Sequence, residues 1–153
     1  MKRIEVKLSL PVVAPLLDVI KQLADGLGKD LAVPFSLGDL DPDFRDAWMA
    51  ELLAAQGDDV RALLALFDDE FFADGVIAFD ASNAEPVLRA CSAVRLRLRE
   101  KCLGVLGDDA LESSDLDIEA MDEQVRKAFM CYLFLATIQE LIIQHLDSSI
   151  LES

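Results

Sequence analysis

The feature that most constrains the fold is the segment from about residue 119 to residue 146, which contains neither glycine nor proline. Within it, residues 129–138 place apolar side chains around the full circumference of a helix. A helix that is apolar on every side is buried in a core or in a partner. At 1.5 Å per residue this helix would be roughly 40 Å long. The sequence therefore predicts a central helix that spans the domain or reaches into a partner.

A second long helix is predicted to begin at Ser82–Glu85, which matches the capping box of a helix N-terminus. At 100° per residue, its apolar side chains fall within about 80° of one another and form a continuous stripe. The stripe consists of Val87, Cys91, Val94, Leu98, Cys102 and Val105. Gly107 is the predicted end of this helix.

Two short strands are predicted from the alternation of apolar residues and from local turn signals. Residues 3–9 alternate apolar and polar side chains, which indicates a strand with one buried face. Pro11 ends this strand, and helical spacing of apolar residues then continues to about residue 25. Residues 75–79 form the second candidate strand, which we expect to pair with the first.

The middle of the chain predicts two further helices. Asp41-Pro42 is typical of an N-cap followed by proline at the first helical position, and Gly57 is the predicted end of that helix. Another helix is predicted from there to Phe67. The fold class is therefore mostly α: a helical bundle of about five principal helices with a small two-stranded β-element, in one domain over residues 1–153.

The composition of the chain restricts the kinds of partner that it is expected to bind and the cellular compartment in which it is expected to be found. The chain is 53% hydrophobic, which favours folding despite a formal net charge of −15. Such an acidic chain is not expected to bind nucleic acid or anionic membranes, because both require concentrated positive charge. The three cysteines predict buried free thiols in a reducing compartment. Without a signal-like N-terminus or an apolar run near the ~20 residues that span a bilayer, we predict a cytoplasmic protein.

No motif in the sequence predicts catalysis, a metal or a cofactor. Residues 39–43 resemble the start of a calcium loop, but Phe44 replaces its glycine and Ala50 its bidentate glutamate. The single histidine, His145, has no nucleophile placed near it by any sequence pattern. We therefore predict no catalytic, cofactor-binding or metal-binding residue.

Basic residues concentrate on the predicted helix that follows Ser82. Arg95, Arg97, Arg99 and Lys101 are candidate partner-binding residues. Arg95 and Arg99 flank one side of the apolar stripe, and Arg97 and Lys101 flank the other. One interpretation is that they neutralise nearby acidic segments and cover the edge of the core with their aliphatic stems. The other is that they form a docking groove for an acidic helix or tail.

Glu140 lies on a narrow polar strip of the last helix, directly after its apolar section. A carboxylate buried there would need a partner, since an unpaired buried charge is costly. Arg95 or Arg99 could supply it, so Glu140, Arg95 and Arg99 are a candidate buried ion pair.

The order of elements resembles a bacterial family of helical proteins that carry a domain of unknown function. The residues that carry this resemblance are the helical segments 88–96 and 132–142. Members of that family are often encoded beside the Clp protease adaptor. The resemblance implies no catalytic residues, and it implies a link to regulated proteolysis.

The large apolar fraction and the absence of catalytic motifs favour a non-catalytic protein-interaction module, such as an adaptor or regulator, as the function. One alternative is a metal-dependent enzyme with carboxylate ligands in a helical bundle. Another is an acidic immunity or antitoxin-like protein. Because the last helix is apolar all round, we also expect a homodimer with that helix at the interface.

Overall fold

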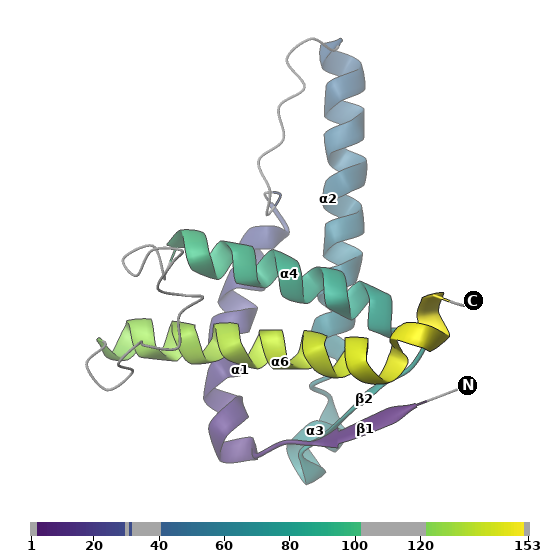
Figure 1. Cartoon of the computed structure of the whole chain (residues 1–153). Helices are drawn as coiled ribbons and strands as arrows, with labels where there is room; N and C mark the ends of the chain where they lie inside the picture. The colour runs from purple at the N-terminus through teal and green to yellow at the C-terminus, as the bar shows by residue number, and fades with distance from the viewer. Residues whose placement is uncertain (1–2, 30, 32–40, 102–121, 152–153) are drawn as a thin grey trace.

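A computed structural model of the chain describes residues 3–29, 31, 41–101 and 122–151. The fold is mostly helical with one two-stranded antiparallel sheet, as predicted. In Figure 1, helices α4 (Ala84–Lys101) and α6 (Glu123–Leu151) run side by side in front of α1 (Leu10–Leu27). The predicted end of α4 at Gly107 lies outside the described residues.

The sheet joins the two predicted strands. β1 (Ile4–Lys7) pairs antiparallel with β2 (Val76–Phe79), and Val6 lies opposite Ile77. The alternation of apolar residues explains the pairing, because Ile77 and Phe79 both point into the core and are almost completely buried. The sheet therefore closes one end of the helical core.

Helix α2 (Pro42–Ala65) begins as predicted, with the Asp41 side chain accepting a hydrogen bond from Asp43 N–H at 3.0 Å. The prediction that Gly57 ends this helix was wrong, since α2 continues without a break to Ala65. A glycine inside a helix costs only about 1 kcal/mol, and burial of Val60 and Leu63 outweighs that cost. Residues 42–65 consequently form one long helix where two were expected, and the first half of α2 projects beyond the other described helices (Figure 1).

A short helix, α3 (Asp69–Asp74), connects α2 to β2. Asp68 caps it, since its carboxylate accepts the Phe71 N–H at 3.1 Å. Gly75 ends it in the left-handed conformation, with φ of 75°. The turn places Phe71, which is completely buried, under the sheet.

The predicted capping box of α4 is wrong by two residues. Asp80 and Asn83 form the reciprocal pair: the Asn83 side chain accepts the Asp80 N–H at 2.9 Å, and Asp80 accepts the Asn83 N–H at 3.3 Å. Ser82 donates its hydroxyl and its N–H to the Asp80 carboxylate. The Asn83 amide also donates to the Ala78 carbonyl at 3.0 Å, which fixes the start of α4 to the end of β2.

We expect Asp80→Ala to lower the free energy of unfolding by about 0.5–2 kcal/mol at pH 7, as loss of a cap does. The hydrogen bond from the Ser82 side chain, followed by that from its backbone N–H, lowers the pKa of Asp80 below its ordinary value of 3.8. The stabilisation is therefore complete above pH 3.8 and is lost as pH falls through the lowered pKa. Urea unfolding of the wild-type protein and of Asp80→Ala, at pH 7 and in acid, measures the difference in stability. Equal stability of the two proteins at pH 7 would contradict the role of Asp80 as a cap.

The core lies between α1, α4 and α6 and is completed by the second half of α2 and by β2. Its largest fully buried side chains are Phe71, Phe79, Ile20, Leu27, Leu63, Ile77, Leu98, Leu135, Ile138 and Ile142. Within the described residues, Glu123–His145 of α6 is long and apolar enough to cross a membrane by length and composition, a test that core helices also pass. Leu135, Ile138 and Ile142 of α6 lie in the core, whereas Met130, Leu133 and Ile143 are exposed, so the apolar segment of α6 is not buried on every side as predicted.

Candidate functional site

The basic residues predicted to bind a partner are divided between two sides of α4. Arg95 and Arg99 are half-buried and line a depression between α4 and α6. Arg97 lies on the other side, is 7% exposed, and donates to the Leu31 carbonyl at 3.1 Å. Lys101 is exposed at the last position of α4. The structure therefore brings together two of the four candidates, and Arg97 serves the packing of α4 on the end of α1.

Arg95 is held in place by neutral groups of α6. Its guanidinium donates from Nη1 to Gln139 Oε1 at 2.7 Å and from Nη2 to the Tyr132 hydroxyl at 3.1 Å. Its Cζ also lies 4.4 Å from the centroid of the Tyr132 ring, in a cation–π arrangement. These contacts fix the side chain in one orientation between the two helices.

Gln139 connects this arginine to the backbone of α4. Its amide donates to the Leu88 carbonyl at 2.9 Å and to the Ser92 hydroxyl at 2.7 Å, while its oxygen accepts from Arg95. The network joins α4 and α6 over two turns. Sequence reasoning missed Gln139, Tyr132 and Ser92 as members of the site, because no local pattern indicates which residues of α6 face α4.

A buried ion pair between Glu140 and Arg95 or Arg99 was predicted. Arg95 does not form this pair with Glu140. Glu140 is exposed, and its carboxylate accepts a hydrogen bond from Gln144 at 3.1 Å, one turn along α6. One residue is 100° of helical rotation, so Gln139 rather than Glu140 faces α4. The prediction named Glu140 as the partner of Arg95, whereas the neighbouring Gln139 makes that contact.

The arginine depression, lined by Ser92, Arg95, Leu96, Arg99 and Tyr132, has a volume of about 290 Å³. Its polar groups are two guanidinium groups and two hydroxyls, so the lining is rich in hydrogen-bond donors and carries positive charge. None of the described residues that line it is acidic. A depression of this size can receive one or two side chains or a small anion.

One exposed apolar side chain lines the arginine depression, and two others lie on α6. Leu96 of α4 is 41% exposed, and Leu133 and Ile143 of α6 are 42% and 52% exposed. At 100° per residue, Leu133 and Ile143 lie within about 80° of each other, on the side of α6 away from the core. We call the arginine depression together with Leu96, Leu133 and Ile143 the α4–α6 outer surface.

The buried thiols offer no reactive centre. Cys91 and Cys131 are fully buried on the facing sides of α4 and α6. Burial raises the pKa of Cys91 to about 12, so the thiolate that nucleophilic chemistry requires is scarce at neutral pH. No group of three or more His, Cys, Asp or Glu among the described residues could hold a metal ion.

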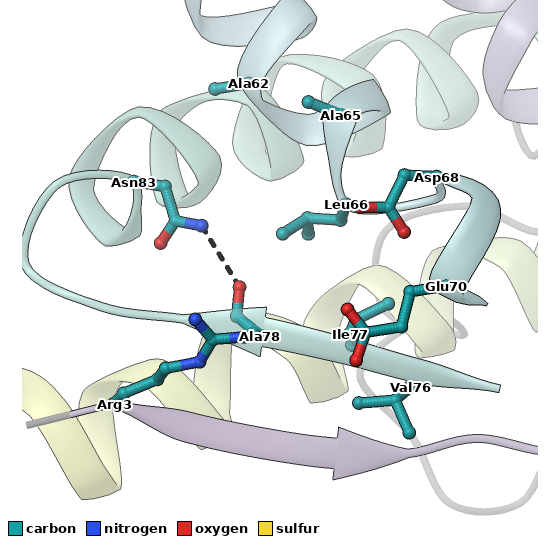
Figure 2. Close-up of a pocket in the computed structure, with 10 residues that line it drawn as sticks. All are labelled: Arg3, Ala62, Ala65, Leu66, Asp68, Glu70, Val76, Ile77, Ala78 and Asn83. Carbon is teal, nitrogen blue, oxygen red and sulfur yellow. Dashed lines mark hydrogen bonds between the residues drawn. The ribbon is translucent and has the colours of Figure 1, made fainter. Parts of the chain in front are cut away.

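A second, smaller pocket of about 210 Å³ lies above β2 (Figure 2). In Figure 2, Arg3 and Asn83 lie at the left of the pocket and Asp68 and Glu70 at the right, with Leu66 between Asn83 and Asp68, above β2. Three of these four polar groups already have structural partners: Asn83 donates to the Ala78 carbonyl, Asp68 caps α3, and Arg3 pairs with Glu5 at 3.5 Å. We therefore place the candidate site at the α4–α6 outer surface.

Residues 18–146 match the model of a family described as "Domain of unknown function (DUF2017)". The chain belongs to this family. The segment that matches DUF2017 contains every residue of the α4–α6 outer surface. Arg3 and β1 lie before the start of that segment. Searches of curated proteins and of solved structures each found no match. The resemblance predicted from the sequence is thereby confirmed at the level of a domain of unknown function.

Proposed function

We propose that this chain is a non-catalytic protein-interaction module that binds a partner through the α4–α6 outer surface. The observation that carries the proposal is the exposed Leu96 in the lining of a donor-rich depression, with Leu133 exposed on α6 next in sequence to the lining residue Tyr132. Apolar contacts flanked by arginine and tyrosine are typical of the energetic centre of protein interfaces. The surface is also rigid, since the Arg95 network joins its two helices.

The chemistry of the remaining described residues supports binding over catalysis. Cys91 has a strongly raised pKa, and His145 is exposed near the end of α6. An enzyme needs a nucleophile or base with a group that orients it. Neither the arginine depression nor the pocket of Figure 2 is lined by a cysteine or a histidine.

Site-specific crosslinking in the native cells tests this proposal. A photoreactive benzophenone amino acid in place of Leu96 is expected to give a discrete crosslinked species, and the same amino acid in place of Val12 is not. Val12 is a matched control because it is 53% exposed on α1, away from the α4–α6 outer surface. Adding Leu133→Glu should remove the crosslink from position 96. Identical crosslinking from both positions would contradict the proposal.

The resemblance to a family encoded beside the Clp protease adaptor extends the proposal to the identity of the partner. On that basis we propose that the partner takes part in regulated proteolysis. Mass spectrometry of the species crosslinked at position 96 tests this extension. A partner with no place in proteolysis would remove the extension and leave the interaction module standing.

A further inference from the structure

Arg95 and Arg89 lie on the same helix and differ in how their charges are neutralised. Arg89 pairs with Asp59 through two hydrogen bonds of 3.0 Å, and it also lies 3.4 Å from Glu85. Arg95 contacts only the neutral Gln139 and Tyr132, and no carboxylate of the described residues lies within ion-pair distance of it.

The donors of Arg95 are also incompletely used. Its Nε is buried and has no hydrogen-bond partner among the described residues. The other two nitrogens are held by α6, so the positive charge is fixed in the lining of the arginine depression. A cation removed from water and without a counter-charge favours the arrival of an anion beside it.

Arg99 adds a second positive charge to the same depression. It lies one turn further along α4, about 6 Å from Arg95 at 1.5 Å per residue. The hydroxyls of Ser92 and Tyr132 complete the lining.

Resting on the proposed function, we propose that the arginine depression receives a carboxylate from an acidic segment of the partner protein. The adjacent Leu96 and Leu133 then contact an apolar side chain of the same segment. The partner motif is thus an Asp or Glu close to a Leu or Phe. A polyanion such as nucleic acid is a poorer match for this surface. The net negative charge of the chain repels its many phosphates more strongly than it repels a single carboxylate.

Peptide display on the full chain tests the inference. Random peptides selected on the wild-type protein are expected to be rich in Asp or Glu next to Leu or Phe. Arg99→Gln should weaken the best selected peptide roughly tenfold, as loss of a charge-assisted hydrogen bond does, and Leu96→Ser should weaken it too. Arg45→Gln is the matched control, since Arg45 lies on α2 beside Asp46. Melting curves verify that each variant is folded, and wild-type binding should weaken with added salt.

The outcomes separate this inference from the proposed function. Peptides without carboxylates that depend on Leu96 but not on Arg99 would overturn the inference and leave the interaction module intact. Peptides that depend on neither residue, or no selected peptide at all, would overturn both. A homodimer in sedimentation that Arg99→Gln dissolves would assign the arginine depression to a second copy of the chain and would also overturn the inference.

Discussion

Leu135→Ala is expected to lower the free energy of unfolding by about 2–5 kcal/mol, the range for truncating a fully buried leucine. Leu135 has 0% exposure in the middle of α6. Three of its α6 neighbours on the core side, Cys131, Ile138 and Ile142, are at most 1% exposed. The truncation therefore leaves a cavity that the surrounding side chains can fill only in part.

Denaturant unfolding measures this effect, and Leu133→Ala is the matched control. Leu133 lies two residues away on the same helix and is 42% exposed. Truncation there should change the free energy of unfolding by no more than about 0.5 kcal/mol, as for most surface positions. A loss below 1 kcal/mol for Leu135→Ala would place α6 at the periphery of the fold.

The predictions that succeeded rest on periodicity and local chemistry. The alternation in residues 3–9 identified β1, and the Asp41-Pro42 signal identified the start of α2 to the residue. Both signals act within a few residues of chain, so no knowledge of distant contacts is required. Pairing of β1 with β2 followed because each strand has one apolar face that must be covered.

The predictions that failed concern choices between neighbouring residues. Ser82–Glu85 satisfies the sequence rule for a capping box, yet Asp80 and Asn83 perform that role. The bond from Asn83 to the Ala78 carbonyl explains the difference, because it ties the cap to β2. A sequence pattern carries no information about such a tertiary contact, and the same is true of Gly57 within α2.

The sequence predicted the residues that α4 contributes to the candidate site but not those that α6 contributes. The concentration of arginines pointed to α4, and separating Arg95 and Arg99 from Arg97 by helical angle agrees with the structure. The contribution of α6 was not predictable, since choosing Gln139 over Glu140 requires the rotation of α6 about its axis. An apolar segment around the whole circumference, as in residues 129–138, gives little information about that rotation.

The sharpest backbone constraint in the described residues lies at Gly75. Its φ of 75° is the only positive φ among them, and its N–H donates to the Phe71 carbonyl at 2.7 Å to end α3. Its carbonyl accepts the Leu8 N–H at 2.7 Å, which extends the contact between the two strands. A Cβ at this position would lie 2.5 Å from the Leu8 carbonyl oxygen, closer than van der Waals contact allows.

Gly75→Ala is therefore expected to lower the free energy of unfolding by about 2–4 kcal/mol, from the left-handed conformation together with the steric clash. The atom in the way belongs to the backbone, so relief requires β1 to move away from β2. Gly26→Ala is the control, because a Cβ there meets nothing within 4 Å and alanine favours the helix. That change should leave stability unchanged or raise it by up to about 1 kcal/mol. Thermal and urea unfolding of both variants measure the difference; a Gly75→Ala protein as stable as Gly26→Ala would mean that β1 is not held against this turn.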